Sequence, residues 1–133
     1  MSQSDPSRPR EHPDVRFAPE QHAIDLRAVA RELAEAPARR GQRQKALYRH
    51  GRLTVALFTF DAGAGLAAHV AAAVVTINVL DGRLRVISGG VENNLPAGNL
   101  LVLAPGVRHD VHALEPSTML LQVYLDDPND AQQ

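Results

Sequence analysis

The chain has 133 residues, no cysteine, and 14 lysines and arginines against 15 aspartates and glutamates, a formal net charge of −1. This length is typical of one domain that buries its own core, and the lack of cysteine excludes disulfides, thiolate metal sites and cysteine nucleophiles. The balanced charge offers no general attraction to nucleic acid or to an anionic membrane surface, so we expect neither as a partner.

Residues 1–22 are polar, rich in proline and without periodicity, which predicts a disordered N-terminal arm. They hold no apolar stretch of the kind that a secretory signal needs. No apolar run in the chain approaches the roughly 20 residues of a membrane span. We therefore expect a cytoplasmic protein. The polar segment 126–133 predicts a C-terminal tail.

Residues 25–36 predict one short helix. Asp25 can cap its first turn by accepting a hydrogen bond from a free backbone N–H, and Pro37 ends it. Apolar side chains recur on one face of this helix, at Leu26, Val29, Ala30 and Leu33. We expect this stripe to pack on the rest of the domain or on a second subunit.

From about residue 45 to about residue 125 the pattern changes to short β-rich runs separated by turn residues. The runs are KALYR, RLTVALFTF, VVTINVL, RLRVI, VENNL, LLVLA, HDVHAL and TMLLQVYL. Several short strands at regular spacing predict an all-β barrel of about eight strands and exclude a βαβ fold. The expected domain therefore covers residues 23–125, a helix followed by a barrel.

Asp81-Gly82 predicts a two-residue hairpin turn between two of these strands. Because side chains alternate between the two faces of a strand, the flanking residues divide into two sets. The apolar set is expected inside the barrel: Val75, Ile77, Val79, Leu84 and Val86. The more polar set is expected outside: Thr76, Asn78, Leu80, Arg83 and Arg85.

Two histidines are predicted to face the interior. Extending the alternation back from Val75 places His69 inside, if no bulge lies between the two. In HDVHAL, the valine and alanine alternate with His112, so His109 is expected to point inward and His112 outward. The predicted pocket is lined by His69, Val75, Ile77, Leu84, His109 and Val111.

These histidine segments resemble the two motifs of the cupin superfamily. GAGLAAHVAAAVVTINVLDG is similar to G-x5-H-x-H-x3,4-E-x6-G, with His69 at the first histidine and Gly82 at the closing glycine. GNLLVLAPGVRHDVHA is similar to G-x5-P-x-G-x2-H-x3-N, with Gly98, Gly106 and His109 in place. The resemblance implies an RmlC-like jelly-roll β-barrel with an N-terminal helix, assembled as a homodimer.

The same comparison implies an incomplete metal site. In metal-binding cupins three histidines and a glutamate hold iron, manganese, nickel or zinc. Here Ala71 stands at the second histidine, Val75 at the glutamate (Thr76 with the longer spacing) and Ala113 at the final asparagine. Only His69 and His109 remain as metal ligands. This set is compatible with a bound divalent transition metal, and it is equally compatible with the absence of any cofactor.

The residues leave the activity open. The leading hypothesis is a small-molecule-binding barrel of unassigned activity, in which the two histidines contact the ligand. An alternative is a metal-dependent oxygenase or isomerase of a small organic substrate, with further ligands that the motifs do not reveal. Two imidazoles could also form a metal-free acid–base pair, or be purely structural. A further alternative is a sensor or assembly module that acts through the helix.

Overall fold

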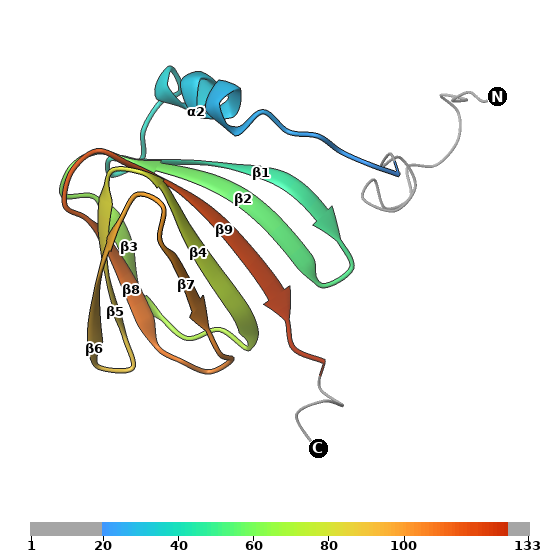
Figure 1. Ribbon diagram of the computed structural model, residues 1–133, viewed down its shortest axis with the longest axis vertical. Helices are drawn as coiled ribbons and strands as arrows, with labels where there is room; N and C mark the ends of the chain where they lie inside the picture. Colours follow the sequence, from blue (N-terminus) through green and yellow to red (C-terminus); the bar gives the residue numbers. More distant parts are fainter. Residues whose placement is uncertain (1–19, 128–133) are drawn as a thin grey trace.

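One helix and nine strands make up residues 20–127, the part of the chain that the computed structural model describes (Figure 1). In chain order they are α2 (Leu26–Ala34), β1 (Gln42–His50), β2 (Leu53–Phe60), β3 (Gly65–His69), β4 (Ala73–Asp81), β5 (Arg83–Ser88), β6 (Val91–Pro96), β7 (Leu100–Leu103), β8 (His109–Ala113) and β9 (Ser117–Leu125). The predicted arm over 1–22 and the predicted tail over 126–133 lie mostly outside the described residues.

The strands form two antiparallel sheets that face each other. Sheet A has the order β1-β2-β9-β4-β7, and sheet B has the order β3-β8-β5-β6. The all-β fold class with one short helix is therefore confirmed. The structure also adds a strand, β3, where the sequence indicated only a turn and a connection.

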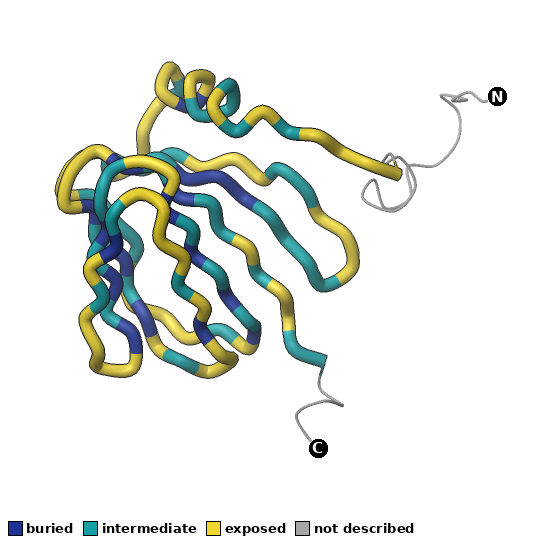
Figure 2. Tube along the Cα trace, viewed as in Figure 1, coloured by how far each residue is buried: buried dark blue, intermediate teal, exposed yellow. Residues whose placement is uncertain are grey.

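The core lies between the sheets and follows the two-residue period of the strands. Buried and partly buried residues alternate along β4, β5 and β8, as the alternating colours of the tube in Figure 2 show. The five residues predicted to face inward are confirmed in the core, each 4% exposed or less: Val75, Ile77, Val79, Leu84 and Val86.

The predicted hairpin at Asp81-Gly82 is wrong. β4 pairs with β7 and β9 in sheet A, whereas β5 pairs with β6 and β8 in sheet B, so the turn is a corner between sheets. Gly82 has a φ of +83°, and a Cβ there would collide with the Pro116 carbonyl and the Ser117 hydroxyl. A positive-φ glycine suits a hairpin and a corner equally, so the dipeptide does not distinguish them.

Helix α2 lies on the outside of sheet A, over β1 and β2 (Figure 1). The Asp25 carboxylate accepts a hydrogen bond from the Ala28 backbone N–H at 3.1 Å, so the predicted cap is present. Leu33 of the helix and Leu57 of β2 are 6% and 0% exposed and lie outside the central core cluster. The helix thus covers one end of sheet A and leaves β4 and β7 uncovered.

Over residues 20–127, no helix has the length and apolar character to span a membrane.

Candidate functional site

A cavity of about 250 Å³ lies between the two sheets. Most of its wall is apolar: Phe58, Leu66, Ala71, Val75, Ile77, Val111, Met119, Leu121 and Val123. Three polar side chains, those of Gln44, His69 and His109, also line it. The cavity therefore combines a hydrophobic wall with a small polar group, which is the usual composition of a small-molecule site.

The two histidines are brought together by backbone pairing. His69 of β3 and His109 of β8 are cross-strand partners, and their ring centroids are 4.4 Å apart with an interplanar angle of 61°. His109 is only 5% exposed, whereas His69 is an exposed residue, so His69 stands on the open side of the cavity. The pair thus reaches from the core to solvent.

A β-bulge in β3 brings His69 to this side of the sheet. Leu66 pairs with Val111, and His69 pairs with His109. From the first pair to the second, β3 therefore advances by three residues and β8 by two. Because side chains alternate, a regular strand with Leu66 inward would turn residue 69 outward. The extra residue reverses the alternation and directs His69 toward His109.

His69 does line the cavity, but the alternation argument that predicted its inward direction is wrong. The chain leaves β3 at His69 and enters β4 only at Ala73, and these strands belong to different sheets. Alternation cannot be carried from Val75 back to His69 across such a break. The bulge at 66–69 supplies the orientation instead.

Both imidazoles are held by their Nδ1 atoms. His109 Nδ1 lies 3.0 Å from the Val107 carbonyl oxygen, and His69 Nδ1 lies 3.1 Å from the Ala67 carbonyl oxygen. A carbonyl oxygen only accepts hydrogen bonds, so each Nδ1 must carry the proton. In the neutral rings, Nε2 is then the nitrogen with a free lone pair, available to a ligand or a metal ion.

Five of the six predicted pocket residues line this cavity, and Leu84 does not. Leu84 pairs with Ala113, whereas Ser88 pairs with His109, so Leu84 lies four residues along the sheet from the histidine. At about 3.3 Å per residue this is about 13 Å from His109, and Leu84 lies beyond Val111, the last residue of β8 that lines the cavity. Leu84 is 0% exposed and belongs to the hydrophobic core instead.

Gln44 is a cavity residue that the sequence did not indicate. It belongs to β1, which begins at Gln42, three residues before the predicted run KALYR. The segment QRQKA gives little indication of a cavity residue. Its polar side chains are typical of an edge strand that faces solvent. Met119, Leu121 and Val123 were assigned to a strand, but one sequence does not show which of its faces meets the cavity.

His112 points away from the cavity, as predicted. Its side chain is 43% exposed, and its Nε2 lies 3.5 Å from the Asp110 carboxylate. No Asp, Glu, Lys or Arg is among the residues that line the cavity. The polar chemistry of the site is thus confined to two imidazoles and one amide.

This donor set does not fit a tightly held metal ion. Within residues 20–127, no group of three or more His, Cys, Asp or Glu side chains is arranged to hold one. Ala71 and Val75, which stand where a histidine and the glutamate are implied, place methyl groups on the cavity wall. Two imidazoles fall short of the three protein ligands that catalytic zinc and iron sites usually have.

No protein-family model and no curated protein sequence matches this chain. Solved structures do match it. A cupin superfamily protein from Desulfitobacterium hafniense superposes with a TM-score of 0.67 at 17% identity, over 81% of this chain and 94% of that one. KdgF from a Halomonas species gives a TM-score of 0.64 at 22% identity, over 71% of this chain and 88% of that one.

Salicylate 1,2-dioxygenase from Pseudoaminobacter salicylatoxidans is also similar, with a TM-score of 0.67 at 15% identity. The match covers 76% of this chain but only 32% of the dioxygenase chain. At these identities the similarity shows a shared architecture and transfers no activity.

Proposed function

We propose that this chain, which has the cupin fold, is a small-molecule-binding barrel whose ligand presents two adjacent hydrogen-bond donors to His69 and His109. The observation that carries the proposal is the engagement of both Nδ1 atoms by backbone carbonyls. Two neutral imidazoles held in this way offer two acceptors side by side. A vicinal diol or a catechol carries two O–H donors on adjacent carbon atoms.

The cavity wall supports a ligand that is small and uncharged. Its volume of about 250 Å³ lies just below the about 300–1,000 Å³ of typical ligand pockets. A charged ligand would lose its hydration among side chains such as Val75, Ile77 and Met119 without gaining an opposite charge. The wall therefore favours an apolar body with a polar edge.

Gln44 supplies a third polar contact to the same ligand. Its amide carries both an acceptor oxygen and two N–H donors. It can therefore accept a bond from a ligand hydroxyl or donate one to a ligand carbonyl.

The lack of cysteine supports a cytoplasmic location for this activity.

Titration with catechol and with 1,2-dimethoxybenzene, followed by protein NMR, tests the proposal. The two probes have the same ring, but the second has no O–H donor. We expect catechol alone to bind, and the His69→Ala and His109→Ala variants to bind it at least about 10-fold more weakly, the effect of losing one hydrogen bond of about 1.4 kcal/mol. His112→Ala, an outward histidine, serves as the matched control.

Equal binding of the two probes, or catechol binding that survives both histidine variants, would contradict the proposal. Metal content of the same proteins, measured by plasma mass spectrometry, separates the alternative. Close to one metal ion per chain, lost in both histidine variants and retained in His112→Ala, would favour the metal-dependent enzyme instead.

A further inference from the structure

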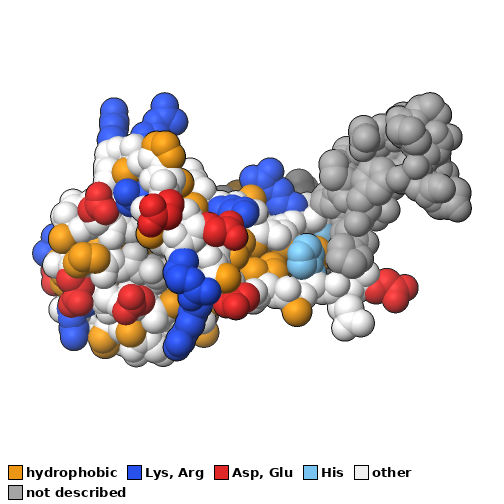
Figure 3. All heavy atoms as spheres, turned by 90° about the horizontal axis from the view of Figure 1, so that it is seen from above, with side chains coloured by type: hydrophobic (Ala, Val, Ile, Leu, Met, Phe, Trp, Pro, Cys, Tyr) orange, Lys and Arg blue, Asp and Glu red, His pale blue; other side chains and the backbone are white. Residues whose placement is uncertain are grey.

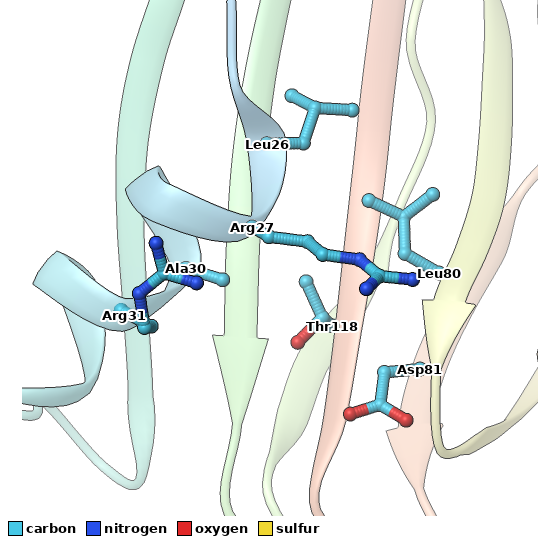
Figure 4. A pocket seen from close by; sticks show the side chains of 7 residues that line it. All are labelled: Leu26, Arg27, Ala30, Arg31, Leu80, Asp81 and Thr118. Carbon is cyan, nitrogen blue, oxygen red and sulfur yellow. The ribbon is translucent and has the colours of Figure 1, made fainter.

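The surface over α2 presents basic, acidic and hydrophobic side chains next to one another (Figure 3). Within this surface, a groove of about 580 Å³ lies between α2 and the ends of β4 and β9 (Figure 4). We call it the helix groove, and it is lined by Leu26, Arg27, Ala30, Arg31, Leu80, Asp81 and Thr118. None of these residues lines the cavity between the sheets, so the two spaces are separate.

The helix groove forms because α2 is narrower than sheet A. The helix contacts β1 and β2, whereas β9 and β4 continue the sheet beyond it. Leu26 and Ala30, four residues apart, lie on the side of the helix that borders the groove. Ala30 ends in a methyl group, so the space between the helix and Leu80 stays unfilled. The volume of the groove lies within the about 300–1,000 Å³ of typical ligand pockets.

Part of the groove wall is apolar and accessible. Leu80 is 37% exposed, and Leu26 and Ala30 are half-buried. We call these three side chains the apolar wall. A ligand that covers them removes their surface from water, and this is favourable where the covering part of the ligand is itself apolar. The helix groove therefore suits a ligand with an apolar group of its own.

Charged side chains of both signs line the same groove. Arg27 and Arg31 are four residues apart, so they emerge from the same side of α2, and Arg27 extends across the groove toward β4 (Figure 4). Asp81 is the last residue of β4. In the part of the chain that the structure describes, none of these three side chains forms an ion pair. Their charges are therefore open to groups of a ligand.

The opposite side of α2 provides an internal comparison. Lys45 Nζ of β1 lies 3.4 Å from the Glu32 carboxylate of the helix. Arg43, also of β1, donates through Nε to the Ala36 carbonyl at 2.7 Å, and its Nη1 lies 3.3 Å from the Asp61 carboxylate. Charged groups at that junction are thus paired within the chain, whereas those at the helix groove are not.

We propose that the helix groove is a second ligand site, for an α-amino acid with an apolar side chain. The carboxylate of the amino acid binds Arg27 and Arg31, its ammonium group binds Asp81, and its side chain covers the apolar wall. Thr118 adds a hydroxyl that both donates and accepts. The two sites share no residue, so the groove ligand does not depend on what the barrel cavity binds.

The charges of the groove distinguish an α-amino acid from other small ligands. The two arginines attract an anion, but Asp81 repels it, and the repulsion is largest for a doubly charged phosphate. An amine without a carboxylate is repelled by the arginines instead. An uncharged apolar molecule covers charged groups and gives them no partner in place of water. An α-amino acid carries both charges on one carbon atom, so it complements both signs at once.

Titration with leucine and three related probes, followed by protein NMR, tests the proposal. 4-Methylpentanoate is leucine without the ammonium group, 3-methylbutylamine is leucine without the carboxylate, and glycine lacks the side chain. We expect leucine to bind at least about 5-fold more tightly than each of the other three, because each probe loses one set of contacts. Backbone signals of Leu80 and Thr118 should move with leucine concentration, and those of His109 should stay fixed.

Substitutions separate the roles of the charges. A double variant with Arg27→Gln and Arg31→Gln should bind leucine and 3-methylbutylamine within about 2-fold of each other, because the carboxylate has lost its partners. Asp81→Asn should do the same for leucine and 4-methylpentanoate. Arg49→Gln is the matched control, since Arg49 is an exposed arginine of β1 that does not line the groove. It should keep both preferences.

Absence of any leucine-dependent shift at the groove up to about 50 mM, a range that covers the weak binding of so small a molecule, would overturn the proposal. So would leucine affinity that is unchanged in both charge variants, or shifts at His109 in place of Leu80. Inorganic phosphate that binds the groove as tightly as leucine would show a general anion site and would overturn it as well. Circular dichroism checks that the variants fold, and the comparison of probes on wild type gives the answer without a variant.

Discussion

His69 reaches His109 only because β3 contains one residue more than β8 between the Leu66–Val111 pair and the His69–His109 pair. The bulge changes the face on which His69 lies without changing the residues of the barrel core. The site therefore depends on strand register as much as on the presence of two histidines.

Deletion of Ala68 should remove the bulge and still leave His69 opposite His109. The histidine then follows Leu66 by two residues, so the two side chains share the inward face of a regular strand. We expect the variant to keep its fold and to bind catechol within about 3-fold of wild type, whereas His69→Ala loses at least about 10-fold. NMR titration measures the affinity, and circular dichroism monitors the fold. A folded deletion variant that binds as weakly as His69→Ala would mean that strand register does not set the direction of His69.

The two histidines should differ in what they contribute to stability. His109 is 5% exposed and donates to the Val107 carbonyl, so His109→Ala should lower the free energy of unfolding by about 1–3 kcal/mol. His69 is exposed, so His69→Ala should change it by less than about 0.5 kcal/mol. Urea denaturation measures both values. A larger loss in His69→Ala than in His109→Ala would contradict the difference in burial between the two histidines.

Gly82→Ala should destabilise the fold more than substitution of an unobstructed glycine. Gly82 has a φ of +83°, and an added Cβ would meet Pro116 and Ser117 at the corner between the sheets. Gly98 has a φ of +93° but nothing within 4 Å of an added Cβ. We expect a loss of about 1 kcal/mol for Gly98→Ala and at least about 2 kcal/mol for Gly82→Ala, measured by urea denaturation. Equal losses would show that backbone conformation alone sets the cost.

The fold could be predicted from the sequence because the alternation of buried and exposed side chains along a strand does not depend on how the strands are connected. Val79 and Leu84 are buried whether the turn between them is a hairpin or a corner, so the wrong turn type left the core assignment intact. β3 was missed because GLAAH has no β-branched residue and follows glycines that are typical of a turn. Its strand conformation is supported by pairing with β8, a contact that local sequence does not encode.

The site could be predicted only in part. His109 lies on β8, where the alternation HDVHA is regular, so its inward direction could be read from the strand itself. His69 needed a bulge that leaves no clear sequence signal, and Gln44 comes from an edge strand that is distant in sequence. Leu84 was predicted in the pocket because it lies on the same face of the strand as the cavity residues. Residues on one face can still lie at different positions along the barrel. Position along the barrel depends on register between strands, which one sequence does not determine.

The position of β9 determines when sheet A can form as the chain is synthesised. β9 is the ninth strand in sequence but lies at the centre of the sheet, between β2 and β4. Leu53 of β2 pairs with Tyr124 of β9, a contact between residues far apart in the chain. Contacts of this kind slow folding, because a long loop must close first. A nascent chain therefore leaves the edges of β2 and β4 without their backbone hydrogen-bond partners until residue 125 has emerged, and this interval is when it is most open to aggregation and to chaperones.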